Sequence, residues 1–415
     1  MNRTDRTFPT LNAVRGIGAL MVLTTHSAFN TGQILRGWSG GPLARLDFGV
    51  PLFFVLSGFL LSRPFFLAIG RGERHPSYRH YLWKRALRIL PLYWAVVVVA
   101  LLFDPANHGL GWEVWVRQLT LTQLYFPTLL PESLTQMWSL CTEVLFYLLM
   151  PLTAYLLTVS RRRRGLHLPT VWVRGVALAV LALAWQSWFA HVPGSEGHYL
   201  QWLPGWMPQF LVGMCFAAVS ADLTLRPRTG RPHLLDRMGT DLAGCWILAA
   251  ALFAIACTPV AGPRTLAQPL GWESGTKDLL YTLAAAFFVL PLMFGPELDG
   301  KVRPYLAGRM PTWLGDISYG VYAIHLFVMG VLFRVLDIVP FTGHFFTILL
   351  LDAAITLTVA TVSWRVYEQP ILRLKNLRWM MRIEPPATRA DLEFQEHAQE
   401  HLPDRERARA GPEPR

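Results

Sequence analysis

An arginine and a histidine share one predicted membrane helix, at a spacing that could serve a single reaction path. Residues 11–30 are mostly apolar and about 20 residues long, enough to cross a bilayer as one helix. Arg15 and His26 are about three turns apart, so they share one face, about 16 Å apart along the axis. Ionisable groups at this depth usually face protein or a water-filled cavity. The simpler alternative is that Arg15 reaches the inner interface and His26 the outer one, each as an anchor.

A carboxylate and a stripe of hydroxyls lie in two other predicted spans. Glu143 falls about two turns into its span from the outer end, where a carboxylate needs a partner. It could pair with a charged histidine, orient its ring or bind a hydroxylated substrate. Ser318, Tyr322 and His325 follow at i, i+4 and i+7, on one helical face. Such a stripe suits the wall of a polar cavity, although a hydrogen-bonded contact between helices would show the same pattern.

Basic residues near the inner ends of two spans could bind an anion. Ser62 and Arg63 lie toward the end of the second span, and Lys84, Arg85 and Arg88 lead into the third. Guanidinium groups match phosphate oxygens with two parallel hydrogen bonds. These side chains could therefore line a cytoplasmic mouth for a polyanionic ligand, although the general excess of Lys and Arg in cytoplasmic loops also explains them.

Fewer polar residues occur in the other spans. Arg365 and Glu368 stand at i, i+3 near the end of the last span and can form a local ion pair. Spans five to eight hold little charge at membrane depth and are predicted to be scaffold. Four polar residues within them could touch a substrate, namely Gln186, His198, Gln201 and Gln209.

Long apolar runs must position all of these residues. The chain has 415 residues, of which 53% are hydrophobic and 16% charged, against about a quarter charged in soluble domains. This composition predicts an all-α, polytopic transmembrane helix bundle of about ten spans. The predicted spans are roughly 9–30, 47–70, 87–103, 137–159, 171–190, 199–221, 241–260, 277–296, 311–335 and 344–370.

The distribution of Lys and Arg predicts the orientation in the membrane. With both termini in the cytoplasm, 29 Lys and Arg residues fall in cytoplasmic segments and 4 in external loops. This asymmetry favours a multi-pass protein of the cell's inner (plasma) membrane with an even number of spans. The net charge of +11 thereby has a membrane explanation, so nucleic acid is not an expected partner.

The chain is predicted to have two regions. Residues 1–380 form the membrane domain, and residues 381–415 form a charged, Pro-containing cytoplasmic tail that is expected to be disordered. The aromatic-rich external loop 104–136 is expected to lie partly at the outer membrane interface. The four cysteines have no metal-ligand spacing, so we predict neither a metal site nor a disulfide. The first span is expected to be an uncleaved anchor.

Six short motifs occur in order over about 360 residues. Each is weak alone, but together they resemble the membrane-bound acyltransferase-3 family of integral membrane O-acyltransferases, over residues 9–376. The chain is similar to the stand-alone form, without the external SGNH-hydrolase-like domain of many relatives. One departure is Lys84, where the family favours arginine. The motifs are R-x10-H at Arg15 and His26, GFLLSR ending in Ser62 and Arg63, KRALR at 84–88, TEVLFY with Glu143, Phe146 and Tyr147, SYGVYAIH at 318–325, and YEQP with Glu368.

The resemblance implies an acyltransferase, with acyl-coenzyme A as a cytoplasmic co-substrate and no tightly bound cofactor. It also implies an acceptor hydroxyl on an envelope glycan, a glycolipid or a lipid-linked sugar at the outer side of the membrane. The acyl group would be acetyl or another short group. Which acyl group and which acceptor are used is left open by the sequence.

The polar residues can be given roles within this scheme. Arg63, Lys84, Arg85 and Arg88 would hold the coenzyme phosphates, and the pantetheine arm would pass Arg15. His26 would deprotonate the acceptor hydroxyl, with Glu143 orienting it, although a covalent acyl-His26 is also open. Arg15, Tyr322 and His325 are candidates for oxyanion stabilisation. Glu368 would organise Arg365 or the donor mouth. The remaining residues predicted to bind substrate are Ser62, Tyr147 and Ser318.

Two other classes of protein would also bury Arg, Glu and His. A lipid or sugar transporter with a central polar pathway is one, although no paired inverted repeat is evident. A membrane scaffold that binds an acyl acceptor without chemistry is the other. Acyl transfer by the purified protein would separate an enzyme from both.

Overall fold

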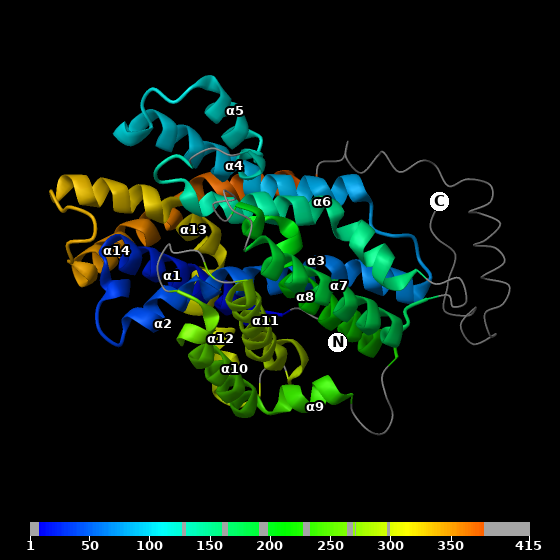
Figure 1. Ribbon diagram of the computed structural model, residues 1–415. Helices are drawn as coiled ribbons and strands as arrows, with labels where there is room; N and C mark the ends of the chain where they lie inside the picture. The colour runs from blue at the N-terminus through cyan, green and yellow to red at the C-terminus, as the bar shows by residue number, and fades with distance from the viewer. Residues whose placement is uncertain are drawn as a thin grey trace, which may run out of the picture. The chain divides into compact units, whose positions relative to one another are not determined.

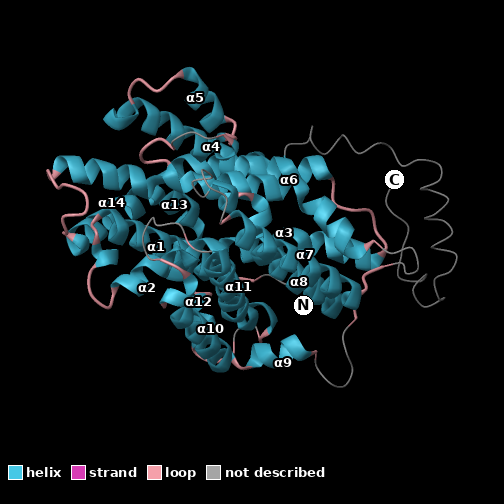
Figure 2. Cartoon of the chain, in the orientation of Figure 1, coloured by secondary structure: helices cyan, strands magenta, loops and turns pink. Residues whose placement is uncertain are grey.

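The predicted helix bundle is confirmed in the part of the chain that the structure describes. The computed structural model describes residues 8–126, 130–159, 165–190, 198–226, 233–263, 269, 271–296 and 299–376. Every regular element in those ranges is helical (Figure 2). Each predicted span corresponds to one long helix: α1 Thr10–Asn30, α3 Gly49–Arg71, α4 Tyr78–Phe103, α6 Trp138–Thr158, α7 Leu168–Phe189, α8 Leu203–Leu225, α10 Leu242–Ala256, α11 Gly271–Phe294, α13 Arg309–Val335 and α14 Phe345–Ser363.

Short helices connect or extend the long ones (Figure 1). Among them, α9 meets α10 at a bend of 91°, and a π-helical turn at Trp364–Glu368 continues α14. Such turns often mark functional positions in helices. The other short helices are α2 Gly40–Ala44, α5 Trp112–Leu119, α9 Leu234–Thr240, α12 Val302–Leu306 and α15 Gln369–Leu372.

The number of membrane spans agrees roughly with the prediction of about ten. Eight described helices are long and apolar enough to cross a membrane, and the bent pair α9–α10 would make a ninth. α1 is not among them, because Arg15, His26 and several Thr, Ser and Asn residues lower its hydropathy. α1 is nevertheless packed against α3, α13 and α14. The cytoplasmic location of the termini stays a prediction.

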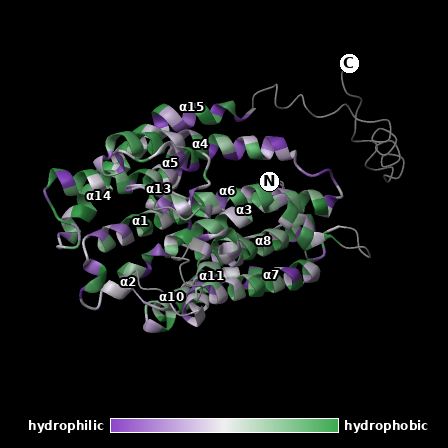
Figure 3. Cartoon of the chain, turned by 45° about the horizontal axis from the view of Figure 1, so that its top comes forward, coloured by the Kyte–Doolittle hydropathy of each residue, from purple (hydrophilic) through white to green (hydrophobic). Residues whose placement is uncertain are grey.

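The bundle has inner and outer helices. α3, α8 and α13 are largely buried in the protein, whereas α7 and α14 are largely exposed. The exposed positions are apolar, such as Val173 at 70%, Leu181 at 66% and Trp188 at 73% exposed. Hydrophobic residues run along α7 and α8 (Figure 3). Apolar surface of this extent is expected where helices meet lipid.

Two glycines let the inner helices α3 and α8 touch through their backbones. A Cβ on Gly58 would lie 2.2 Å from the carbonyl oxygen of Phe210, and one on Gly213 would lie 2.1 Å from the carbonyl oxygen of Val55. Small residues at such crossings are a common means of packing membrane helices. The glycine of the GFLLSR motif therefore has a structural reason, since it fixes the position of α3.

We expect Gly58→Ala to destabilise the protein by about 1–3 kcal/mol, the usual result of overpacking a close contact. The backbone of Phe210 has no flexible tip that could move aside for the new methyl group. Thermal unfolding in detergent, followed by fluorescence, would measure the change. Gly70→Ala on the same helix is the matched control, because its Cβ would meet mainly the side-chain tip of Leu225. Equal unfolding midpoints for the two variants would contradict the prediction.

The loop predicted to be external, residues 104–136, is attached to the bundle through Asp104. Its carboxylate accepts hydrogen bonds from Arg334, at 2.8 Å, and from Ser133, at 2.5 Å. α5 lies in this loop, with Trp112 74% exposed. A location of α5 at the outer membrane interface stays a prediction.

Residues to Leu372 form one compact unit, and a second unit begins at Arg373. Of the second unit only residues 373–376 are described, as a single 3-10 turn. The predicted tail from residue 381 lies outside the described residues. The four cysteines all lie in described residues, and none of them forms a disulfide.

Candidate active site

A close contact between α1 and α13 positions the two histidines of the site. A Cβ on Gly315 would lie 2.2 Å from the carbonyl oxygen of Asn12, so the two helix backbones touch near the start of α1. Both helices then run alongside each other in the interior of the unit. His26 on α1 and His325 on α13 therefore meet, although 299 residues separate them in the sequence.

The two imidazole rings form a directed hydrogen-bonded pair. Nδ1 of His26 lies 2.9 Å from Nε2 of His325, and Nδ1 of His325 lies 3.1 Å from the carbonyl oxygen of Val321. A carbonyl oxygen only accepts, so Nδ1 of His325 carries a proton. In a neutral His325 ring, Nε2 is then the acceptor and Nδ1 of His26 the donor. This network assigns to a neutral His26 an Nε2 with a free lone pair.

His325 does not have the substrate contact predicted for it. Its side chain is completely buried, with 0% exposed, and each ring nitrogen has a protein partner. It therefore has no free donor for an oxyanion. Its contacts indicate that it holds the ring of His26, a relation that no local sequence pattern could reveal.

Arg15 and His26 face two different cavities. The first cavity, of about 100 Å³, is lined by Arg15. The second, of about 460 Å³, is lined by His26. The three-turn spacing on α1 thus separates two sites along the helix.

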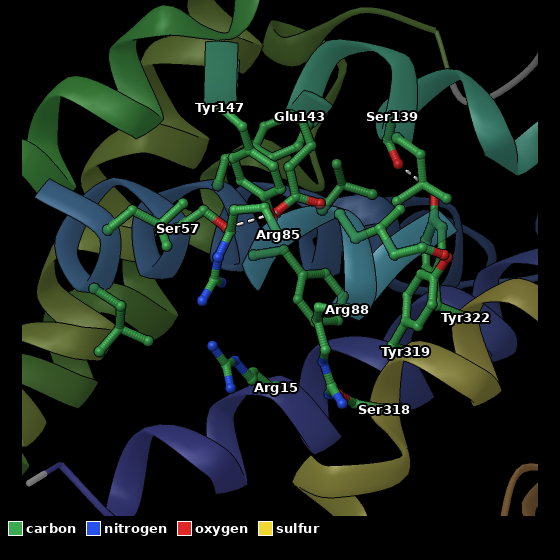
Figure 4. A pocket seen from close by; sticks show the side chains of 17 residues that line it. Arg15, Ser57, Arg85, Arg88, Ser139, Glu143, Tyr147, Ser318, Tyr319 and Tyr322 are labelled. Carbon is green, nitrogen blue, oxygen red and sulfur yellow. Dashed lines mark hydrogen bonds between the residues drawn. The ribbon is translucent and has the colours of Figure 1, made fainter. Parts of the chain in front are cut away.

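Three arginines converge on the first cavity. Arg15 of α1 and Arg85 and Arg88 of α4 line it, and the guanidinium groups of Arg15 and Arg85 point toward each other (Figure 4). Nε of Arg85 is buried and has no hydrogen-bond partner in the part of the chain that the structure describes. Like charges held together repel unless an anion lies between them. This end of the cavity is suited to bind an anionic group.

Glu143 belongs to the first cavity and not to His26. Its Oε1 accepts hydrogen bonds from Ser57, at 2.5 Å, and from the hydroxyl of Tyr147, at 2.6 Å. Both partners also line the cavity. The prediction that Glu143 orients His26 is therefore wrong, because His325 occupies that position.

Two residues of the GFLLSR motif point away from the first cavity. The cavity face of α3 carries Val50, Phe53, Phe54, Ser57, Leu60 and Leu61. Arg63 lies on the neighbouring face, where it donates to Ser220 at 3.0 Å and Thr224 at 3.1 Å on α8. Ser62 donates to the carbonyl of Gly58 at 2.6 Å. Neither residue lines the cavity, which corrects their predicted role in substrate binding.

The basic motif on α4 is divided in a similar way. Arg85, Arg88 and Ile89 line the first cavity, at the i, i+3, i+4 spacing of one helical face. Lys84 is half-buried and is not among the lining residues. The predicted set of four basic side chains is thus reduced to Arg85 and Arg88, and Arg15 joins them.

Glu368 lies against Arg88 and not against Arg365. Its Oε2 is 4.0 Å from a terminal nitrogen of Arg88, and Ser363 donates to its Oε1 at 3.4 Å. The guanidinium of Arg88 also lies over the ring of Trp364, 4.8 Å from its centre. Arg365 is exposed. The local ion pair suggested by the sequence is not formed, because the π-helical turn directs Glu368 toward α4.

The second cavity combines aromatic rings with amide and charged groups. Trp138 and Trp206 line it with their ring centres 5.1 Å apart. Lys277 donates to Asp47 at 2.7 Å, and Tyr281 also donates to Asp47. Three glutamines lie in the wall, Gln136, Gln186 and Gln201.

Three buried polar atoms in the wall of the second cavity have no hydrogen-bond partner among the described residues. These are two acceptors, Oδ2 of Asp278 and Oε1 of Gln136, and one donor, Nε1 of Trp206. Gln209, predicted as a substrate contact, is instead buried behind the wall, where it donates to Asp278 at 2.5 Å and to Thr282 at 2.9 Å. Unsatisfied buried acceptors are rare and call for a donor.

Tyr322 and Val50 are the residues that line both cavities. The hydroxyl of Tyr322 donates to the carbonyl of Gln136 and lies 2.6 Å from Ser139, whose proton it can accept. Its one proton is thus in use and is not free for an oxyanion. Ser318, one turn earlier on α13, lines the first cavity and donates to the carbonyl of Gly315 at 2.7 Å.

Sequence reasoning missed most of the second cavity. Asp47, Lys277 and Asp278 lie in segments that were predicted as a loop or as the end of a span. α11 begins at Gly271, so Asp278 lies two turns inside a helix that was predicted to begin at 277. The run of polar residues before position 277 was an ambiguous signal, because such a run is also typical of a loop.

The chain matches one protein-family model, described as an acyltransferase domain, over residues 8–365. It is similar to the peptidoglycan O-acetyltransferase OatA of Listeria monocytogenes, with 24% identity over 398 residues, which are 89% of this chain and 57% of that protein. The chain therefore spans little more than half the length of that relative.

Two further relatives are matched over more of their own length. The acyltransferase MdmB of Streptomyces mycarofaciens is 26% identical over 79% of this chain and 90% of that protein. The exopolysaccharide production protein ExoZ of Rhizobium meliloti is 25% identical over 68% of this chain and 76% of that protein. No solved structure matches the chain.

Proposed function

The chain belongs to the acyltransferase-3 family, and we propose that it moves a short acyl group from acyl-coenzyme A in the first cavity to a hydroxyl of an envelope glycan in the second. The observation that carries the proposal is the division of α1, which presents Arg15 to one cavity and His26 to the other. In this proposal the site for the anionic donor, beside Arg15, and the base, His26, lie on two sides of one partition. On the predicted topology the first cavity is the cytoplasmic one.

The first cavity suits the donor because of its charge. Among the described residues, the three arginines outnumber the two carboxylates near them, Glu143 in the wall and Glu368 beside Arg88, which favours phosphate groups. The volume of about 100 Å³ is below the 300–1,000 Å³ usual for ligand pockets. The cavity therefore holds the acyl end and the adjoining part of the pantetheine arm, while the nucleotide lies at or beyond the arginines.

The second cavity suits a glycan acceptor. Its volume of about 460 Å³ lies within the usual range for a ligand. Indole rings such as Trp138 and Trp206 offer apolar faces to sugar rings, and the amides offer hydrogen bonds. Sugar hydroxyls can donate to Oε1 of Gln136 and Oδ2 of Asp278 and accept from Nε1 of Trp206, the three buried atoms of the wall that have no partner among the described residues. The relatives named for peptidoglycan and exopolysaccharide support the same class of acceptor.

The proposed step begins at His26. Its free Nε2 takes the proton of the acceptor hydroxyl, while Nδ1–H stays bonded to His325. The acceptor oxygen then bonds to the thioester carbonyl carbon, and the carbon–sulfur bond breaks. The proton on Nε2 passes to the leaving thiolate, so the products are an ester and free coenzyme A. Tyr147 and Ser57 hold Glu143 in the donor cavity, where it contributes to positioning the arginines.

We expect membranes that contain the protein to incorporate label from radioactive acetyl-coenzyme A into the envelope glycan fraction. The label should resist solvent extraction and be released by mild alkali, because an ester is formed. Membranes from a strain lacking the protein are the control, and mass spectrometry of their glycans would locate the missing ester. Label that crosses the membrane without becoming covalently attached would indicate the transporter instead.

A further inference from the structure

The partition between the two cavities is formed by a valine and a tyrosine. Val50 and Tyr322 line both cavities, whereas Arg15 lines only the first and His26 only the second. If the donor lies in the first cavity, its acyl group must reach His26 past these two side chains. We infer that Val50, together with Tyr322, sets the length of acyl group that the protein transfers. This inference rests on the proposed function.

Tyr322 is a fixed side of the partition. Its hydroxyl is held at 2.6 Å by the carbonyl of Gln136 and at 2.6 Å by Ser139. Its ring packs edge-on against Phe53, with the ring centres 6.1 Å apart, and the side chain is 5% exposed. Moving the ring would break two hydrogen bonds in a buried place, which is costly.

Val50 is fixed by the backbone beside it. A Cβ on the preceding residue, Gly49, would lie 2.3 Å from the carbonyl oxygen of Gly18, so α1 and α3 are in direct backbone contact at this point. A valine in a helix also has one strongly preferred rotamer. With only 7% of its surface exposed, Val50 cannot turn aside. Its two methyl groups therefore stay in the partition between the two cavities.

The wall around the partition explains why the length of the acyl group would be selected at the partition and not elsewhere in the first cavity. Part of the wall of the first cavity is apolar, with side chains such as Phe54, Leu60 and Leu140, which an acyl chain can contact without loss of hydrogen bonds. Figure 4 shows Arg15 and Arg85 on one side of the cavity and Ser139 and Tyr322 on the other. A donor anchored at the arginines would thus meet the partition with its acyl end.

Val50→Ala tests the inference through the ratio of two transfer rates. Membranes carrying the wild type or the variant are given radioactive acetyl-, butyryl- or hexanoyl-coenzyme A, and alkali-labile label in the envelope glycan fraction is counted. We expect the ratio of hexanoyl to acetyl transfer to rise by about tenfold or more, because a few methylenes in an apolar passage give discrimination of this order. An unchanged ratio in an active Val50→Ala variant would overturn the inference.

Two further variants make the result specific. Val55→Ala makes the same change on the same helix, at a side chain that is 0% exposed and lines neither cavity, and its ratio should equal that of the wild type. If Val50→Ala does not fold, Val50→Ile should lower the ratio by about tenfold, and an unchanged ratio in Val50→Ile would overturn the inference in the same way. Failure of the proposed function looks different, since the wild type would then transfer none of the three acyl groups.

Discussion

Replacing His26 by alanine is expected to lower acyl transfer by about 10²- to 10⁴-fold, the usual contribution of a general base. The variant should bind acyl-coenzyme A as well as the wild type does, because Arg15, Arg85 and Arg88 line the other cavity. Label transfer from radioactive acetyl-coenzyme A measures the first effect, and calorimetric titration of the purified protein measures the second. An equal loss of transfer activity and of acyl-coenzyme A affinity would place His26 in the donor site and contradict its assignment as the base.

His75→Ala is a suitable control, because that histidine is exposed and lies in the loop before α4. Full activity in His26→Ala would overturn the role of the base. Mass spectrometry after quenching could detect a stable acyl group on His26 in the wild type. That result would mean that His26 carries the acyl group covalently and does not act as a base.

His325 offers a finer test of how His26 is held. A glutamine at this position can still accept a hydrogen bond from Nδ1 of His26 through its amide oxygen, whereas a leucine of similar size cannot. His325→Gln should therefore keep more activity than His325→Leu, with acyl-coenzyme A affinity unchanged in both. Equal activities would mean that His325 only fills space.

Much of the site on α1 could be predicted, because its information is local. The helical period alone places Arg15 and His26 on one face and three turns apart, and membrane depth argues that neither faces lipid. The structure adds that the face is divided between two cavities. Periodicity gives the direction of a side chain relative to its own helix, and it cannot say whether one cavity or two lie opposite.

The rest of the site depends on contacts between distant segments. His26 meets His325 because Gly315 lets α13 approach α1. Arg63 does not line the donor cavity, because Gly58 and Gly213 bring α8 against the face of α3 that carries Arg63. Asp278 was missed for another reason. Its polar side chain resembled the end of a span, but its carboxylate accepts a hydrogen bond from Gln209 inside the protein, so Asp278 lies within the span. The errors at His325 and Arg63 followed from not knowing which helix packs on which face.

Reversing the charge of Arg85 is expected to raise the dissociation constant of acyl-coenzyme A by about 10²-fold. A hydrogen bond to a charged group is worth about 1.5–3 kcal/mol, and each 1.4 kcal/mol changes the affinity by about tenfold. Arg85 is the arginine most affected by an anion, since its Nε has no hydrogen-bond partner among the described residues. Titration of purified Arg85→Glu with acetyl-coenzyme A, at several salt concentrations, would measure the change.

Arg79→Glu is the matched control for this prediction. It makes the same change of charge on the same helix, at an exposed residue outside the cavity, so its affinity should stay close to that of the wild type. Repeating the titrations with acetyl-pantetheine, which lacks the nucleotide and its phosphates, identifies the group that Arg85 binds. A loss of affinity confined to acetyl-coenzyme A would assign the guanidinium to a phosphate. An equal loss with both donors would assign it to the arm or the thioester and place the reacting end of the donor further from His26 than we propose.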